Sequence, residues 1–270
     1  MKLSYEPIRY DYRVIGTKAV SEGYHSVKSS EELLIESRLP MPFVRYQILK
    51  FTRKVNTNAD DSAFDNFAKD SANALCYFEL EFTPKGGISY VANHENLKKK
   101  WISDLNILRS KYAGGWADRA LEEMTDVINN EQKLRAAIAQ DFCLDELYNR
   151  KIYVIAFDSK TRTASQTCTE TAIDSIPFVF VQQCIFKQYL REQVVVIDGI
   201  APLNENKEAI MQLCKGKTFK SEDVVIITQH TEYRAFELLN IPEKIETVFK
   251  VNDKNGCLKE VNINIQTRKY

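Results

Sequence analysis

The sequence has 270 residues, and its charges balance, with 37 lysines and arginines against 37 aspartates and glutamates. No global field therefore draws the protein to nucleic acid or to an anionic membrane. Met1 to Tyr10 contains no apolar run of signal-peptide length, and no later run approaches the roughly 18 apolar residues that span a bilayer. These features predict a soluble cytoplasmic protein without a nucleic-acid or membrane partner.

The length allows a large hydrophobic core. No linker rich in Pro, Gly or Ser divides the chain, so we expect a single compact domain over residues 1–270. Six cysteines are scattered, and none forms a CxxC pair with another. Free thiols are therefore expected rather than a disulfide framework. Frequent Lys, Ile, Asn and Tyr are typical of an AT-rich bacterial gene, and this codon bias says nothing about function.

The N-terminal half, residues 1–93, is rich in strand patterns. Apolar and polar residues alternate over Ile8–Ile15, which indicates a strand with one solvated face. The segment 31–37 is compatible with a short helix or with an edge strand ended by the prolines that follow. A further strand is predicted over Phe43–Val55, and a short helix over 64–74.

Residues 76–92 predict a β-hairpin. Apolar residues alternate with polar ones over Cys76–Phe82, as a half-buried strand requires, and again over Ile88–Ala92. Between them, Pro84 and the pair Gly86–Gly87 supply the residues that tight turns favour.

A helical block, residues 94–149, is predicted to follow Asn93, a candidate N-cap. The apolar spacing changes there to three and four, which places one stripe on a helix face. The stripe consists of Leu97, Trp101, Leu105, Leu108 and Tyr112. The helix should end at Gly114–Gly115. The pattern resumes near Trp116, and a possible bend at Asn129–Asn130 leaves open whether one helix or two follow.

The C-terminal half, residues 150–270, has stronger strand patterns. Strands are predicted at Ile152–Phe157, Phe178–Phe186, Gln193–Ile197, Val224–Thr228, Val248–Val251 and Val261–Ile265. The Ser/Thr-rich stretch 158–175 has little apolar surface to bury, which favours a loop or a mobile hairpin. A short helix is allowed within 203–213, and Asn255–Gly256 predicts a tight hairpin turn. We therefore expect an α+β fold, with a mainly antiparallel β-sheet in two sequence halves and the helical block between them.

Two short runs begin like catalytic motifs and do not complete them. The run CKGKT, which begins at Cys214, ends like a phosphate-binding loop, but Met211 stands where that loop needs a glycine. His94 and Glu95 begin like a zinc-protease helix, but Lys98 occupies the place of the second histidine. A charged turn and a helix start are the structural interpretations. We predict no catalytic residue, no metal and no cofactor from these motifs.

Two charged groups have a structural and a functional interpretation. Asp141 and Asp145 lie one helical turn apart, near Glu146, and could share a cation or a proton. A solvated helix end is the structural interpretation, and we favour it. Basic residues around Phe51, namely Arg45, Arg53 and Lys54, could belong to a nucleic-acid surface, but the neutral composition favours a solvated sheet face.

The run KYAGGWADR, residues 111–119, is the predicted binding site. Two glycines free the backbone, and Tyr112, Trp116 and Arg119 are residue types that dominate binding hot spots. In the structural interpretation, Tyr112 and Trp116 anchor two helices to the sheet. We call residues 111–119 the glycine tip.

Three functions are compatible with the sequence. The first is a non-enzymatic protein–protein interaction module, such as a bacterial assembly, adaptor or immunity-type protein, because the sequence has no recognisable catalytic motif. The second is a binder of an apolar small molecule in a cleft between sheet and helices. The third is a hydrolase with dispersed acid and base residues, Asp141, Asp145, His94 and His230, of which at least two should meet in one cleft. The sequence favours the first, with another protein as partner and the oligomeric state undetermined.

Overall fold

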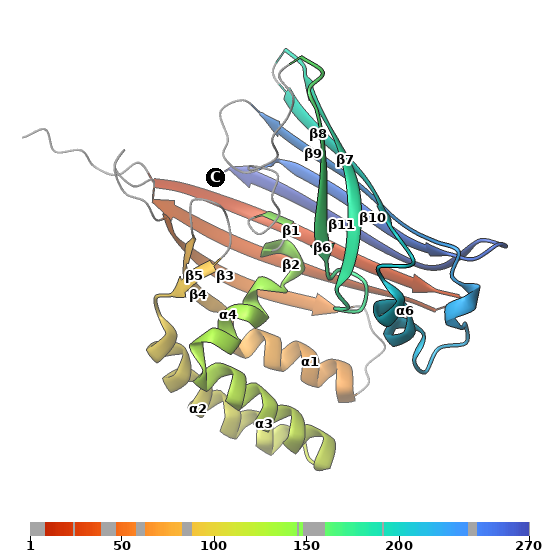
Figure 1. Ribbon diagram of the computed structural model, residues 1–270. Coiled ribbons are helices and arrows are strands. Elements are labelled where there is room, and N and C mark those ends of the chain that lie inside the picture. Colours follow the sequence, from red (N-terminus) through yellow and green to blue (C-terminus); the bar gives the residue numbers. More distant parts are fainter. Residues whose placement is uncertain are drawn as a thin grey trace, which may run out of the picture. The chain divides into compact units, whose positions relative to one another are not determined.

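The computed structural model describes residues 9–23, 25–38, 47–57, 63–82, 88–144, 146–147, 160–190, 192–236 and 242–269 (Figure 1). These residues form an α+β fold with a mainly antiparallel sheet, which confirms the predicted class.

The chain divides into two compact units. Unit 1 consists of Met1–Ile15, Ser29–Arg150 and Thr267–Tyr270, and unit 2 consists of Gly16–Lys28 and Lys151–Gln266. Three strands run from one unit into the other, namely β1 (Arg9–Glu22), β2 (His25–Arg38) and β11 (Cys257–Lys269). Because the chain divides into two compact units, the expected single domain over residues 1–270 stays a prediction.

Antiparallel pairing joins the strands of unit 1. β2 pairs with β3 (Gln47–Thr57), β3 with β4 (Tyr77–Phe82), and β4 with β5 (Ile88–Val91). The predicted hairpin over 76–92 is thereby confirmed. The segment 31–37, which the sequence left open, lies in a strand with β3 beside it rather than in a helix.

Helices cover unit 1's strands on one side (Figure 1). They are α1 (Ala63–Ala74), α2 (His94–Lys111), α3 (Gly115–Asn129), α4 (Glu131–Ala139) and α5 (Phe142–Leu144). The expected bend near residue 130 is a break between α3 and α4. There Asn130 is the N-cap of α4, and its Oδ1 accepts a hydrogen bond of 3.1 Å from the Lys133 backbone N–H. This bond satisfies one of the first N–H groups of the new helix.

Asn93 precedes α2 at the predicted N-cap position, but its side chain binds a strand instead of the helix. Its Oδ1 accepts from the Glu79 backbone N–H at 3.0 Å, and its Nδ2 donates to the Tyr77 carbonyl at 3.3 Å. Asn93 is buried, so these bonds compensate for the lost hydration of its amide. The residue therefore fixes the start of α2 against β4.

The predicted stripe of α2 faces the interior of unit 1. Leu97, Trp101 and Leu108 are buried. The Trp101 indole Nε1 donates to Thr125 Oγ1 of α3 at 2.9 Å, which satisfies the one polar atom of a fully buried ring. A periodicity visible in the sequence thus fixes which face of the helix packs.

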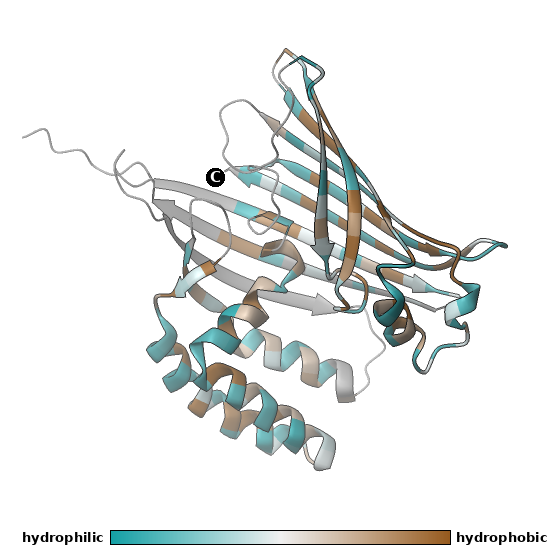
Figure 2. Ribbon diagram, in the orientation of Figure 1, coloured by the Kyte–Doolittle hydropathy of each residue, from teal (hydrophilic) through white to brown (hydrophobic). Residues whose placement is uncertain are grey.

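Unit 2 is built on a run of antiparallel strands. They are β6 (Thr163–Glu170), β7 (Phe178–Gln188), β8 (Glu192–Ala201), β9 (Ile226–Phe236), β10 (Lys244–Asn252) and the residues of β11 up to Gln266. Each pairs with the next in chain order. Hydrophobic and hydrophilic residues alternate along these strands (Figure 2), as expected of a sheet with one buried face.

Strand β6 corrects one expectation. The stretch 158–175 was expected to be a loop or a mobile hairpin, and the loop interpretation is wrong because residues Thr163–Glu170 pair with β7 throughout. Threonine is β-branched and favours strands even where it brings little apolar area. The strand predicted at Ile152–Phe157 lies outside the described residues.

The sheet of unit 2 is strongly rolled around its buried face. The rings of Phe180 on β7 and Phe249 on β10 have centroids 5.8 Å apart, although β8 and β9 lie between these strands. Three strand spacings would separate them by roughly 14 Å in a flat sheet. We call the buried face the inner face and the opposite one the outer face.

A buried polar cluster occupies part of the inner face. Gln182 of β7 donates from Nε2 to Gln229 Oε1 of β9 at 2.7 Å, across Gly199 of β8. Gln182 also donates to Glu170 Oε1 at 3.2 Å. Both glutamines are almost fully buried, so these bonds offset the cost of removing the amides from water.

An ion cluster closes one end of the rolled sheet. Lys259 of β11 is 3% exposed, and its Nζ lies 2.9 Å from Glu22 Oε2 of β1 and 2.8 Å from Asp174 Oδ2 in the β6–β7 connection. Lys217 Nζ lies 2.8 Å from the same Glu22 oxygen. Burial raises the pKa of Glu22, but the hydrogen bonds from Lys217 and Lys259 outweigh it, and the net pKa lies below the usual value.

Between β8 and β9 the chain forms a short helix, α6 (Lys207–Cys214), and a 3-10 turn (Ser221–Asp223). The helix falls in the range 203–213 that the sequence allowed and extends one residue beyond it. The CKGKT run follows it as a charged turn, since Lys217 is bound in the ion cluster and Gly216 has a φ of 76°. The lysine that would contact a phosphate in the rejected motif thus has a structural role.

Candidate binding surface

The outer face of unit 2 carries a row of exposed apolar side chains. The register pairs Val181 of β7 with Ile200 of β8, and these side chains are 41% and 54% exposed. Ile185 lies on the same face of β7, beyond Gln183, and is 38% exposed. The strand alternation explains the arrangement, because the phenylalanines of β7 take the inner face and leave these residues outside.

A polar row crosses the outer face beside that apolar pair. Gln183, Asp198 and His230 follow one another from β7 to β9 in direct register. The Gln183 amide donates from Nε2 to Ser165 Oγ on β6 at 3.0 Å, which extends the row to a fourth strand. Apolar and polar rows therefore alternate along the strands of this face.

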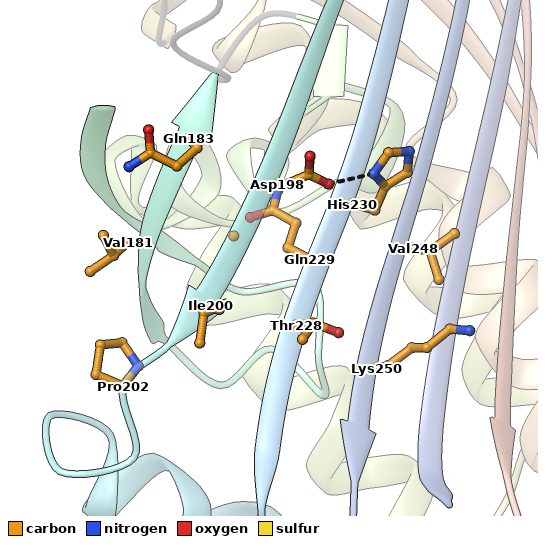
Figure 3. Close-up of a pocket in the computed structure, with 11 residues that line it drawn as sticks. Val181, Gln183, Asp198, Ile200, Pro202, Thr228, Gln229, His230, Val248 and Lys250 are labelled. Atoms are coloured by element: carbon orange, nitrogen blue, oxygen red, sulfur yellow. Dashed lines mark hydrogen bonds and ion pairs between the residues drawn. The ribbon is translucent and has the colours of Figure 1, made fainter. Parts of the chain in front are cut away.

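These rows line a groove of about 710 Å³ on the outer face of β7–β10 (Figure 3). Its lining includes Val181, Ile200 and Val248 among apolar residues, and Gln183, His230 and Lys250 among polar ones. The exposure of Val181 and Ile200 shows that the groove is open to solvent. No residue of the helical block is among its lining residues.

Asp198 and His230 form a close pair in the groove. The His230 Nδ1 lies 2.7 Å from Asp198 Oδ1, as the dashed line in Figure 3 marks, and both side chains are more than half exposed. The carboxylate fixes the ring orientation through Nδ1 and leaves Nε2 to meet a ligand. Such a pair can orient a hydrogen bond to a bound molecule.

A second cation lies in the same groove. Lys250 Nζ of β10 is 3.2 Å from Glu260 Oε2 on β11, and its side chain is about half exposed. An exposed ion pair of this kind contributes little to stability. The lysine can therefore turn toward a bound partner at small cost.

The sequence did not identify the groove. It predicted strands that contain several of its residues, but it did not show which of their side chains face solvent. The available signal was the alternation of Phe178, Phe180 and Cys184 with Val181 and Gln183. That alternation separates an inner from an outer face once the pairing of the strands is known.

The glycine tip lies in unit 1, between α2 and α3. Tyr112 is 6% exposed and donates from its hydroxyl to Asp70 Oδ2 of α1 at 2.7 Å. The rings of Tyr112 and Trp116 both meet the Phe67 ring edge to face, at 5.3 Å. These contacts anchor the two helices to α1.

Trp116 and Arg119, the other two predicted binding residues of the glycine tip, are exposed to solvent. Trp116 is 37% exposed. The side chain of Arg119 is partly bound within α3, since its Nε donates a hydrogen bond to the Gly115 carbonyl at 3.0 Å. Binding through Tyr112, Trp116 and Arg119 stays a prediction, in which Trp116 offers the accessible aromatic surface.

Of the four residues proposed for a dispersed hydrolase, the three that the structure describes have separate partners. Asp141 accepts at Oδ1 from the backbone N–H groups of Cys143 and Leu144, both at 3.0 Å, which is a helix-cap geometry. His94 lies 2.7 Å from the Ile128 carbonyl, and His230 is paired with Asp198. Asp145 lies outside the described residues, as do Arg45 and the side chains of Phe51, Arg53 and Lys54.

The described part of the chain holds no cluster of three His, Cys, Asp or Glu residues that could bind a metal ion. Burial raises the pKa of the Cys184 thiol to about 11, so this cysteine stays protonated and unreactive near neutral pH. Among the described helices, none is both long and apolar enough to cross a membrane.

Comparisons with known proteins add little to this description. No family model and no curated protein matches the chain. A solved structure described as "Lipid-protein interactions in lipovitellin" matches 99% of this chain, at 13% sequence identity and a TM-score of 0.45. The match covers 25% of that structure's chain. At this TM-score the likeness carries no argument about fold or function.

Proposed function

We propose that this chain is a non-enzymatic protein–protein interaction module that binds its partner through the groove on the outer face of unit 2. The observation that carries the proposal is the directly paired Val181 and Ile200, two branched apolar side chains left exposed on adjacent strands. Their direct pairing makes them neighbours across two strands rather than scattered surface residues. Exposed apolar clusters rimmed by polar groups are typical of interaction sites.

The rim supplies directional contacts around this apolar centre. His230 can offer a ring nitrogen, Gln183 an amide and Lys250 an ammonium group to a partner. An apolar centre with a polar rim is the usual anatomy of a protein interface.

The openness of the groove favours a protein over a small molecule. Small-molecule sites bury roughly 70–90% of the ligand surface. Here the lining spreads over four strands, and Val181 and Ile200 remain about half exposed. A protein segment lying on the face would cover such a surface, whereas a small molecule would stay largely in water.

The proposal is tested by capture of partners from a lysate of the source organism, with wild-type protein and three variants. Ile200→Glu places a charge in the groove. Met211→Glu is the matched control, because Met211 is 66% exposed on α6 and is not among the groove's lining residues. Trp116→Ala tests the glycine tip. Circular dichroism first confirms that each variant folds.

We expect a stoichiometric partner that Ile200→Glu loses and Met211→Glu retains. Loss in Trp116→Ala alone would move the interaction to the glycine tip. If no stoichiometric partner is captured and an apolar small molecule copurifies instead, the interaction proposal is wrong and the small-molecule alternative replaces it.

A further inference from the structure

The turn that joins β10 to β11 contains an asparagine followed by a glycine. Of all the asparagines in the sequence, Asn255 alone precedes a glycine, Gly256. Both residues are exposed to solvent. A hydrogen bond of 2.9 Å from the Asp253 backbone N–H to the Gly256 carbonyl closes the turn. No residue from 253 to 256 is among the groove's lining residues, so the chemistry of this turn is separate from partner binding there.

An asparagine side chain can react with the backbone of the residue that follows it. The Gly256 peptide nitrogen loses its proton to hydroxide and attacks Asn255 Cγ. As the new N–C bond forms, the bond between Cγ and the side-chain nitrogen breaks, and this nitrogen takes up a proton and leaves as ammonia. Water then opens the resulting succinimide ring at one of its carbonyl carbons, which gives aspartate or isoaspartate. A glycine favours the first step because it has no side chain to hinder the close approach.

The nitrogen that would attack is held by Asp253. The Asp253 Oδ1 accepts hydrogen bonds from the backbone N–H groups of Asn255 and Gly256, both at 2.7 Å. A hydrogen bond to a carboxylate is roughly twice as strong as one between neutral groups. Removing the proton from the Gly256 nitrogen would break this bond and would place a negative charge beside the carboxylate. The Asp253 side chain therefore opposes the first step of the reaction.

We propose that Asn255 is a site of slow self-modification, at which the chain exchanges a side-chain amide for an acid through a succinimide, and that Asp253 sets the rate by holding the Gly256 nitrogen. The two reacting groups are adjacent in the chain, and water is the co-reactant. The modification needs no partner and no occupant of the groove. Asp253 acts here through the Gly256 nitrogen and is a positioning residue.

Either product changes the turn between β10 and β11. Aspartate adds a second carboxylate close to Asp253, and like charges repel at this distance. Isoaspartate leads the backbone through the side-chain carbon and lengthens it, so the spacing that closes the Asp253 N–H onto the Gly256 carbonyl is lost. β11 continues from this turn to Lys259, the buried cation of the ion cluster. The modification therefore loosens the end of the sheet that holds this cluster.

Peptide mapping by mass spectrometry measures the conversion at position 255 while the full chain is incubated at mildly alkaline pH. Each conversion exchanges ammonia for water and raises the mass of the peptide. We expect both aspartate and isoaspartate at position 255. Aspartate alone would show direct hydrolysis of the side-chain amide and would refute the ring. Asn255→Gln, whose longer side chain closes a ring less readily, is the control that assigns the conversion to this residue.

Two variants of Asp253 test its role in the folded protein, after circular dichroism has confirmed that both fold. Asp253→Ala removes the acceptor, and we expect the conversion at position 255 to become faster by about tenfold or more. Asp253→Asn is the matched control, because its amide oxygen can accept the same two bonds without a charge. It should accelerate the conversion less than Asp253→Ala does.

Unfolding in guanidinium chloride separates the hydrogen bonds from the effect of the neighbouring sequence. The turn is absent there, so the wild type and Asp253→Ala should convert at rates within about threefold of each other. The wild type should also convert faster unfolded than folded. Equal rates for the folded and unfolded wild type, or a folded Asp253→Ala that converts no faster than the folded wild type, would overturn the role of Asp253. Absence of conversion at position 255 in all of these proteins would overturn the modification site itself.

Discussion

Gly199 on β8 occupies a position where a side chain has no room. Gln182 and Gln229 stand opposite it on the two neighbouring strands, and their amides bond to each other across it at 2.7 Å. A Cβ at this position would lie 3.1 Å from Gln229 Oε1, 3.3 Å from Gln182 Cγ and 3.3 Å from Gln229 Cβ. Both glutamines are almost fully buried, so neither can swing away into solvent.

The expected effect of Gly199→Ala on the free energy of unfolding follows from three contributions. Forcing an extra carbon into a packed region costs about 1–3 kcal/mol. Weakening the bond between the glutamines costs a further amount of about 1 kcal/mol. Replacing glycine by alanine in a regular element returns about 0.5–1 kcal/mol through the lost freedom of the unfolded chain. We therefore expect a net destabilisation of about 2 kcal/mol.

Urea unfolding, followed by circular dichroism, measures this difference. Gly115→Ala is the matched control, because a Cβ there meets no atom within 4 Å and Gly115 is the first residue of α3. We expect the control to be neutral or slightly stabilised. Equal unfolding midpoints for Gly199→Ala and the wild type would show that the two glutamines do not depend on the gap at Gly199.

Three further predictions concern the ion cluster and a helix cap. Lys259→Met removes the buried cation that Glu22 and Asp174 share and leaves them only the more exposed Lys217. Urea unfolding at neutral pH should show a loss of about 3 kcal/mol, and an unchanged midpoint would show that the buried lysine is not a structural cation. The pKa of Glu22 is lowered in the folded protein, so its contribution to stability is complete above pH 4.5 and declines as the pH falls through the folded pKa. The difference in the free energy of unfolding between the wild type and Glu22→Gln should therefore become smaller in acid. A difference that does not change with pH would contradict the lowered pKa of Glu22. Asn130→Ala removes the N-cap of α4 and should lower stability by about 1 kcal/mol, with Asn129→Ala as the exposed control in the same unfolding experiment.

Local patterns in the sequence were sufficient to predict much of unit 1. The stripe that begins at Leu97 and includes Trp101 identified α2, because helical period and burial agree there. The glycines at 114–115 and the asparagines at 129–130 marked the breaks between helices, since both residue types favour helix ends. In each case neighbours in the chain decide the structure.

Strand β6 shows where local patterns fail. A run of hydroxyl residues with little apolar area has no periodic signal, and its pairing partner β7 begins eight residues after it ends. The stabilising contacts lie across the sheet, between Gln166 and Gln182 and between Glu170 and Gln182. Nothing in the local sequence of β6 reveals them.

The groove was hidden from sequence reasoning for a related reason. Val181 and Ile200 each belong to a strand whose composition suggests burial on both faces, and only the register shows that they meet on the solvated side. The same register places Gly199 between Gln182 and Gln229 on the other side. One glycine therefore allows the inner face to close over a polar pair, while the residue that follows it, Ile200, faces solvent. The inner packing and the outer surface of β8 are consequences of a single alternation, which a shift of one residue would reverse.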